Sequence, residues 1–222
     1  MRQRFLKWLG TKIALLVRAV EKDVNRKTLP KFRNEPRNLH VESPHRLINA
    51  RRIEVGDDVS LGPGCMINAI RRYPGAFMSG APEDVKAQHF DPLIRLGNRV
   101  SATGYLTIGA CKSVVIEDDV LIASHVFISD NAHGRSRTDL AYKFQPLEDI
   151  AGVRIGRGSW IGEHAVILPG VTIGEYAIVG ANSVVSQDIP PRSIAVGSPA
   201  RIVKSWDVET ASWQTVERHD EA

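Results

Sequence analysis

The sequence predicts an all-β solenoid: a parallel β-helix of hexapeptide repeats with two long inserted loops and an N-terminal amphipathic helix. Three observations predict it, namely a six-residue period of aliphatic residues, two long segments without that period, and helical spacing of apolar residues near the N-terminus. The chain has 222 residues, of which 43% are hydrophobic and 24% charged, as in ordinary globular domains. Aromatic residues are only 6%, so the core must consist of aliphatic side chains, which suit β-strands.

The six-residue period is clearest from Ile155, where the chain reads IGRGSW, IGEHAV, ILPGVT, IGEYAI, VGANSV and VSQDIP. The same phase recurs earlier, from Val55, Leu96 and Ile116. This period fits neither the spacing of a helix, about 3.6 residues per turn, nor the alternation of a hairpin meander. Three hexads make one triangular coil of 18 residues, and the aliphatic position of each hexad points inward and stacks on the next coil.

Two segments interrupt the repeat, residues 69 to 93 and residues 134 to 153. They hold several of the aromatic, proline and charged residues. Loops of ~20 residues inside a repetitive scaffold are more often functional than not. We expect both to project from corners of the coil, and the second to border the site served by the residue before it, His133.

The two ends of the chain divide from the repeat region. We predict a helix and linker over 1–44, a β-helix domain over 45–204, and a tail over 205–222 that forms a short helix with Trp206 and Trp213 on one side. The N-terminal helix follows from apolar residues three or four apart with Arg and Lys between them. It either packs on the first coil or on a neighbouring subunit, or lies on a membrane surface. Its apolar positions are Phe5, Leu9, Ile13, Leu16, Val20 and Val24.

Composition excludes several classes of function. No apolar stretch reaches 18 residues and no cleavable signal is visible, so we expect a cytoplasmic protein. Cys65 and Cys111 lie in no metal-binding or disulfide pattern. The net charge is +4, but the basic residues are scattered, which argues against nucleic acid as a partner.

With the hexads assigned, residues 45–204 resemble the hexapeptide-repeat acyltransferases of left-handed parallel β-helix fold. The branch they resemble includes galactoside and maltose acetyltransferases and the O-acetyltransferases of bacterial polysaccharide synthesis. The resemblance is carried by VLIASHVFISDNAHG, GSWIGEHAVILPGVTIG and VGANSVVSQDIPPRSIAVGSPARIVK. It implies a left-handed coil, a homotrimer, acetyl-CoA bound between adjacent subunits, and no metal.

The resemblance makes His133 the general base, since the acceptor hydroxyl must lose its proton as it attacks a thioester. Asp130 is the first candidate to orient that imidazole, with a backbone carbonyl as rival. Asp130 could equally bind an acceptor hydroxyl or cap a turn. Where sugar-acetylating relatives hold the acceptor, this chain has Thr103 and Cys111, so the acceptor stays open.

The resemblance also implies a set of residues that contact acetyl-CoA. The main-chain amide of Glu163 would face the thioester, because the oxyanion that forms there needs a fixed N–H donor. Trp160 would wall the pantetheine arm or acetyl group, or else lie buried at the trimer seam. The basic members would attract the nucleotide phosphates, with Arg192 compensating for a lysine that relatives often have. The set is Trp160, Glu163 (main chain), Ala181, Ser186, Gln187, Arg201 and Lys204.

Together these features predict an acetyl-CoA-dependent O-acetyltransferase acting on a sugar hydroxyl, in surface polysaccharide synthesis. Within the enzyme class, the alternative is an N-acetyltransferase of an amino-sugar nucleotide. Outside the acyltransferases, the alternatives are a gamma-type carbonic anhydrase-like metalloprotein and a non-enzymatic solenoid scaffold. His125 and His133 are eight residues apart, without the close histidine pair that the zinc enzyme needs.

Overall fold

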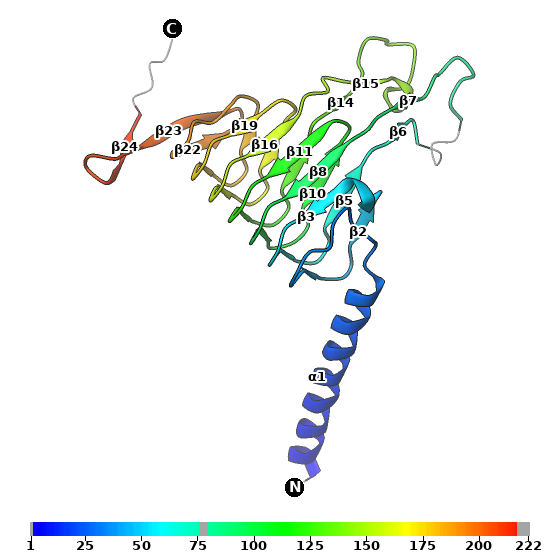
Figure 1. The fold of residues 1–222 in the computed structure, drawn as a ribbon, viewed down its shortest axis with the longest axis vertical. Helices are drawn as coiled ribbons and strands as arrows, with labels where there is room; N and C mark the ends of the chain where they lie inside the picture. Colours follow the sequence, from blue (N-terminus) through cyan, green and yellow to red (C-terminus); the bar gives the residue numbers. More distant parts are fainter. Residues whose placement is uncertain (1, 76–79, 217–222) are drawn as a thin grey trace.

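The computed structural model describes residues 2–75 and 80–216 and confirms the parallel β-helix (Figure 1). Among these residues, three sheets form the sides of a triangular coil, and the chain visits a nine-strand, a six-strand and a five-strand sheet in turn. We call the corner between the nine-strand and six-strand sheets the first corner. The corner between the six-strand and five-strand sheets is the second corner, and the one that returns to the nine-strand sheet is the third.

Within each sheet a strand pairs in parallel with the strand of the next coil, except at the C-terminal end, where β22, β23 and β24 pair antiparallel. The nine-strand sheet contains β1 (His40–Val41), β4 (Ser60–Leu61), β9 (Ser101–Ala102), β12 (Leu121–Ile122), β17 (Trp160–Ile161), β20 (Ile178–Val179), β22 (Ser193–Gly197), β23 (Ala200–Asp207) and β24 (Ser212–Thr215). The six-strand sheet contains β2 (Arg46–Ile48), β5 (Met66–Ala69), β10 (Thr107–Ala110), β13 (Phe127–Ser129), β18 (Val166–Ile167) and β21 (Val184–Val185). The five-strand sheet contains β3 (Ile53–Val55), β8 (Leu93–Leu96), β11 (Ser113–Ile116), β16 (Val153–Ile155) and β19 (Thr172–Ile173).

Two stretches run outside these sheets, residues 70–92 (the first segment) and residues 130–152 (the second segment). Each leaves the coil at the second corner, after β5 and after β13 respectively. The first contains the antiparallel pair β6 (Arg72–Tyr73) and β7 (Gln88–His89). The second contains β14 (Ala132–His133), β15 (Leu147–Glu148) and a 3₁₀ turn at Tyr142–Phe144. Both segments are thus brought to one side of the coil.

The core consists of the inward side chains of all three sheets, stacked coil on coil. Ile108, Ile128 and Ile167 are adjacent in the six-strand sheet, and each is fully buried. Burial of an Ile or Leu side chain contributes about 1.5–3 kcal/mol, so a continuous aliphatic column provides most of the stabilisation available to a coil.

The coils are not all of the predicted length. Trp160 pairs with Ile178, 18 residues later, as predicted, but Ser101 pairs with Leu121, 20 residues later. The early coils carry longer strands, β10 and β11, on either side of the second corner.

The N-terminal helix is confirmed as α1 (Arg2–Thr28), which projects from the first coils (Figure 1). After it, Leu29 and Phe32 pack against the core and close its open end. The coil begins at His40, before the predicted residue 45. Among the described residues, no helix is long and apolar enough to span a bilayer.

The predicted C-terminal helix is wrong: β23 and β24 form an antiparallel hairpin, and the last part of the tail, 217–222, lies outside the described residues. Trp206 pairs directly with Trp213, and their rings meet edge to face with centroids 5.3 Å apart. The hairpin gives the main chain of β22 a partner that a helix could not supply, and it brings the two indoles together across the strands.

Candidate functional site

His133 lies on β14 at the second corner, with its side chain exposed. It pairs with Leu147 of β15, and the next residue, Gly134, donates its N–H to the Pro146 carbonyl at 2.8 Å. A Cβ on Gly134 would lie 2.4 Å from that carbonyl oxygen, so only glycine permits this close approach. The local sequence thus fixes the main chain that carries the imidazole.

Tyr73 of β6 contacts the His133 ring, with its Oη 3.0 Å from Nδ1. The same hydroxyl donates to the Lys143 carbonyl at 2.6 Å. A tyrosine hydroxyl has one proton, and a carbonyl can only accept, so Tyr73 must accept from His133 at Nδ1. His133 therefore carries its proton on Nδ1, and Nε2 presents a lone pair.

The hydroxyl of Tyr73 stays protonated because burial raises its pKa above the usual value near 10. Tyr73 belongs to a small second core with Cys111 and Leu147, against which Ile70 and Phe90 pack. The partner of His133 is thus rigidly held. Sequence reasoning missed it, since Tyr73 lies 60 residues before His133.

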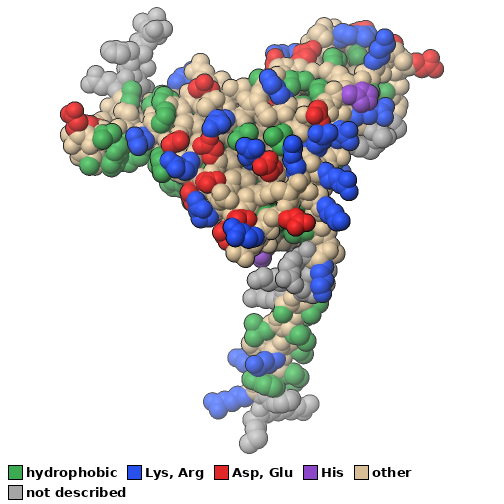
Figure 2. Space-filling model, viewed as in Figure 1, with side chains coloured by type: hydrophobic (Ala, Val, Ile, Leu, Met, Phe, Trp, Pro, Cys, Tyr) green, Lys and Arg blue, Asp and Glu red, His purple; other side chains and the backbone are tan. Residues whose placement is uncertain are grey.

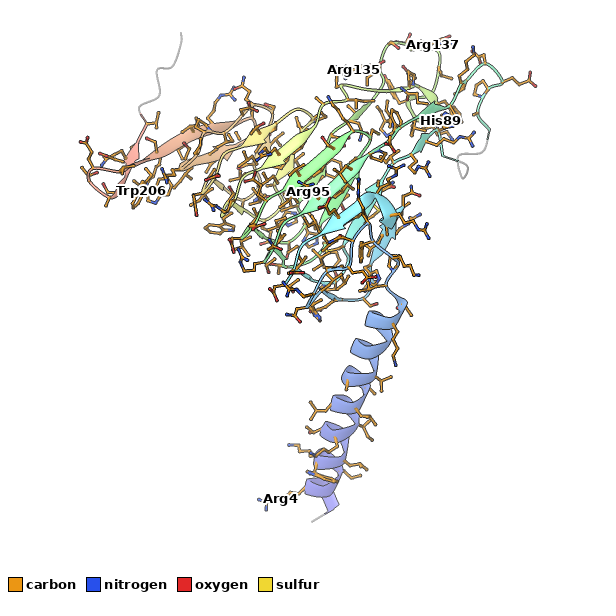
Figure 3. The ribbon with its side chains drawn as sticks, viewed as in Figure 1. Arg4, His89, Arg95, Arg135, Arg137 and Trp206 are labelled. Atoms are coloured by element: carbon orange, nitrogen blue, oxygen red, sulfur yellow. The ribbon has the colours of Figure 1, made fainter. Side chains whose placement is uncertain are left out.

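The two segments are joined by further contacts. The Gln88 side-chain amide forms two hydrogen bonds with the main chain of Leu147. It donates to the Leu147 carbonyl at 3.1 Å and accepts from the Leu147 N–H at 2.6 Å. Arg137 approaches Asp84 at 3.7 Å. Figure 3 shows His89 of the first segment at the same end of the molecule as Arg135 and Arg137 of the second. Phe77, an aromatic residue of the first segment, lies outside the described residues.

Asp130 does not orient His133, which corrects the first of the sequence alternatives. Its buried carboxylate accepts the main-chain N–H groups of Cys111, Lys112 and Ser113 at 2.6–2.7 Å, and the Asn131 side-chain amide at 2.9 Å. The carboxylate caps the turn at the second corner of the preceding coil, the third alternative. Its lone pairs are occupied, so it holds the turn and not the imidazole.

Cys111 and Thr103, the two positions at which the resemblance predicts acceptor contacts, differ in solvent exposure. Cys111 is buried, and burial together with the charge of Asp130 raises the pKa of its thiol to about 12. It is a packing residue of the second core. Thr103 is exposed beyond β9, near the first corner.

Several residues of the predicted acetyl-CoA set lie on the outward face of the nine-strand sheet. In register, Trp160 lies beside Ile178, Ile178 beside Ile194, and Ile194 opposite Lys204. Directly paired residues project to the same side of a sheet, and neighbouring strands are about 4.8 Å apart. Trp160 and Lys204 therefore lie in one row about 14 Å long.

Arg201 joins that row because of a bulge in the last pairing. It lies opposite Val196, two residues from Ile194 on β22, and so projects to the same face as Lys204. Trp160 is half exposed at 48%, on a strand and not at a corner. The face offers an indole at one end and two cations at the other.

The remaining residues of the predicted acetyl-CoA set lie at corners of the coil. Glu163 and Ala181 are exposed at the first corner of successive coils, where the Glu163 carbonyl accepts the Asn182 N–H at 2.8 Å. Ser186 and Gln187 follow β21, exposed at the second corner. Arg192 is exposed at the third corner.

One chain therefore does not bring the whole predicted set together. His133 lies at the second corner, which joins the six-strand and five-strand sheets. Trp160 and Lys204 face outward from the nine-strand sheet, which does not border that corner.

The first corner carries a stack of rings. Tyr105, His125 and His164 follow one another in successive coils, with centroids 4.5 and 4.8 Å apart and rings within 17° of parallel. His125, His164 and Glu163 each offer one ligand atom within 4.8 Å of the others. Parallel rings direct their in-plane lone pairs side by side and not at one point, so this arrangement is a stack and not a zinc cage.

Comparisons with known proteins agree with this architecture. Residues 152–187 match the family model described as bacterial transferase hexapeptide (six repeats). The chain is 39% identical over 129 residues to the putative lipopolysaccharide biosynthesis O-acetyl transferase WbbJ of Escherichia coli K12, covering 55% of this chain and 65% of that relative. It is 39% identical over 116 residues to the galactoside O-acetyltransferase of the same organism, covering 50% of this chain and 53% of that relative. The matches thus span less than two thirds of either relative.

A solved structure of similar fold is that of a mutant of AntD, an N-acyltransferase from Bacillus cereus, in complex with dTDP and coenzyme A. Its TM-score is 0.64 with 17% identity, covering 86% of this chain and 91% of that one, which shows the fold alone. The resemblance of the chain to hexapeptide-repeat acyltransferases is confirmed, and the left hand of the coil follows from that likeness.

Replacement of Asp130 tests its role as a cap. Asp130→Asn keeps one acceptor oxygen but turns an amide toward main-chain donors, and each buried donor without a partner costs about 1–3 kcal/mol. We expect urea unfolding to show a loss of about 2 kcal/mol or more. Asp139→Asn, at an exposed ion pair with Arg137, is the control and should leave the urea midpoint nearly unchanged, because solvent screens such a pair. Equal stabilities of the two variants would contradict the capping role.

Replacement of Tyr73 tests the tautomer. Tyr73→Phe removes the acceptor at Nδ1, so the ¹⁵N shifts of the His133 ring should move from those of an Nδ1–H imidazole toward a mixture of tautomers. Tyr142→Phe, in the same segment but 62% exposed, should leave them unchanged. Identical ring spectra in the wild-type chain and Tyr73→Phe would show that another group fixes the proton.

Proposed function

We propose that the chain is an acetyl-CoA-dependent O-acetyltransferase acting on a sugar hydroxyl, in surface polysaccharide synthesis. The observation that carries the proposal is the exposed His133 ring, whose Nδ1 proton is fixed by Tyr73 while Nε2 is free to accept. The names of the two relatives, an O-acetyl transferase of lipopolysaccharide biosynthesis and a galactoside O-acetyltransferase, support this choice of acceptor.

In the reaction, Nε2 of His133 takes the proton of the acceptor hydroxyl as its oxygen attacks the thioester carbonyl. A C–O bond forms, the tetrahedral intermediate collapses, and the C–S bond breaks. The imidazolium returns the proton to the leaving thiolate, so histidine ends as it began. Neutral imidazole in general suits this task, because it can take up a proton and release it again near pH 7.

Acetyl-CoA is proposed to lie along the row on the nine-strand sheet. Arg201 and Lys204 would attract the nucleotide phosphates, and Trp160 would flank the pantetheine arm. The main-chain N–H of Glu163, an exposed residue at the first corner, would face the thioester oxygen, where negative charge develops. No metal takes part in these steps.

The active unit is proposed to be a homotrimer. Leu121, Trp160 and Ile178 form an outward apolar row on the nine-strand sheet, and Phe127 is exposed on the adjoining six-strand sheet. An exposed apolar band of this kind is typical of a subunit contact. Packing it against a second copy also unites the separated halves of the site.

The protein is proposed to act in the cytoplasm and to contact the inner face of the membrane through α1. The exposed apolar side chains of α1 support this placement. An acceptor attached to a membrane carrier would then lie within reach of the second corner.

Removal of the base tests the activity. Thiol release from acetyl-CoA, measured with hexoses, oligosaccharides and amino-sugar nucleotides, should be greatest with a hydroxyl acceptor. His133→Ala should lower kcat by ~10²–10⁴-fold with little change in the KM for acetyl-CoA. His40→Ala, in the first coil, is the control and should keep full turnover. Wild-type turnover in His133→Ala would remove the proposed site, and preference for an amino sugar would favour N-acetylation.

Disruption of the apolar row tests the assembly. Light scattering should give three times the chain mass of 24.5 kDa. Leu121→Glu should dissociate the trimer and abolish turnover, because burial of a carboxylate without a partner is costly. Val115→Glu is the matched control, since Val115 projects from the five-strand sheet between Arg95 and Arg154. A monomeric Leu121→Glu variant with full turnover would contradict the shared site.

A further inference from the structure

A basic pocket lies at the N-terminal end of the coil, at the second corner of the first coil and beside the start of the first segment. Its volume is about 650 Å³, and four of its seven lining residues are basic. The lining is Pro30, Lys31, Asn49, Ala50, Arg51, Arg52 and Arg71.

The local fold explains why these cations gather. Asn49 takes a left-handed conformation, φ 57°, and its side-chain amide donates to the Ala69 carbonyl at 2.7 Å. This bond ties the 3₁₀ turn that carries Arg51 to the end of β5, from which Arg71 follows. The main-chain positions of Arg51 and Arg71 are therefore held close together by this hydrogen bond.

The positive charge of the pocket is largely uncompensated. Arg52 pairs with Asp91 at 2.6 Å. Lys31, Arg51 and Arg71 are exposed and form no ion pair with any residue of 2–75 or 80–216. Three neighbouring cations without counter-charge form a site for an anion, and guanidinium groups suit phosphate oxygens in particular.

The pocket adjoins the end of α1, which ends at Thr28, two residues before Pro30. Lys31 follows Thr28 by three residues, which span at most about 11 Å, so any surface on which the end of α1 rests is close to Lys31. The pocket and the helix must therefore meet the same environment.

The character of α1 indicates that environment. One stripe of the helix is apolar and 38–65% exposed, and Figure 2 shows such side chains along its length. Residues 2–20 contain five basic and no acidic residues. Parallel copies of such a helix would place like charges together, whereas an anionic bilayer complements them. The stripe consists of Leu6, Leu9, Ile13, Leu16 and Val20.

From these observations we infer that the pocket of Lys31, Arg51, Arg52 and Arg71 binds the phosphate of an anionic lipid headgroup while α1 lies in the bilayer interface. The inference rests on the proposed membrane contact and adds a lipid site to it. The apolar stripe of α1 inserts into the bilayer interface, and the pocket makes binding selective for anionic lipids.

Flotation of the full chain with vesicles tests the inference. Vesicles of phosphatidylcholine containing about one third phosphatidylglycerol should bind the protein, and pure phosphatidylcholine should not. Arg51→Ala/Arg71→Ala should weaken binding by roughly 10-fold to 30-fold, since each basic residue near an anionic surface adds about a factor of five. The matched control is Lys86→Ala/Lys112→Ala, two exposed lysines that form no ion pair in the described part of the chain.

A second pair of variants separates the pocket from the helix. Leu9→Glu/Ile13→Glu should abolish binding, while Val208→Glu, at an exposed apolar residue of the C-terminal hairpin, should not. Circular dichroism and the thermal midpoint verify that each variant is folded.

The outcomes are distinguishable. Binding unchanged in Arg51→Ala/Arg71→Ala overturns the lipid site but leaves the contact of α1 intact. Absence of wild-type binding to anionic vesicles overturns both. Saturable binding of inorganic phosphate by calorimetry, lost in the same double variant, assigns the pocket to a free phosphate ligand and overturns the lipid assignment.

Discussion

The stacking of aliphatic side chains from one coil onto the next is the constraint on which the rest of the structure depends. Each coil is held only by its neighbours, so the inward positions and the parallel hydrogen bonds must recur. Chemistry is left to outward positions and to corners. The three faces use this freedom differently: Arg95 pairs with Glu54 on the five-strand sheet, whereas Leu121 and Trp160 stand exposed on the nine-strand sheet.

A consequence of this constraint is that a coil can carry a long excursion only where its turn is separately held. The two segments leave the second corner in coils that flank a third, whose turn at residues 111–113 lies between them. Asp130 accepts all three main-chain N–H groups of that turn. The side chain of Cys111 then forms part of the floor on which Tyr73 and Leu147 pack.

The sequence was informative where structure is periodic and local. The hexads predicted the sheets, and the spacing of Leu9, Ile13 and Leu16 predicted α1. The C-terminal hairpin was missed because its Trp206–Trp213 pair depends on an open strand, β22, and not on local propensity. The expectation that Asp130 orients His133 rests on their three-residue spacing and on the acidic residue that the resembled branch often has at this position. Tyr73, the actual partner, lies in another segment, and its contact depends on how two excursions pack.

Asp130 therefore acts on His133, but through structure and not through a hydrogen bond to the ring. Its carboxylate fixes the turn, the turn positions Cys111, and Cys111 packs with Tyr73, whose hydroxyl sets the tautomer. Asp130, Cys111 and Tyr73 are all buried, so a shift of a few tenths of an ångström among them is not absorbed by solvent. A buried acidic residue three positions before an exposed histidine is then explained without any direct role in proton transfer. In a β-helix of this kind, an acidic residue at that position is to be assigned to the turn before it is assigned to the base.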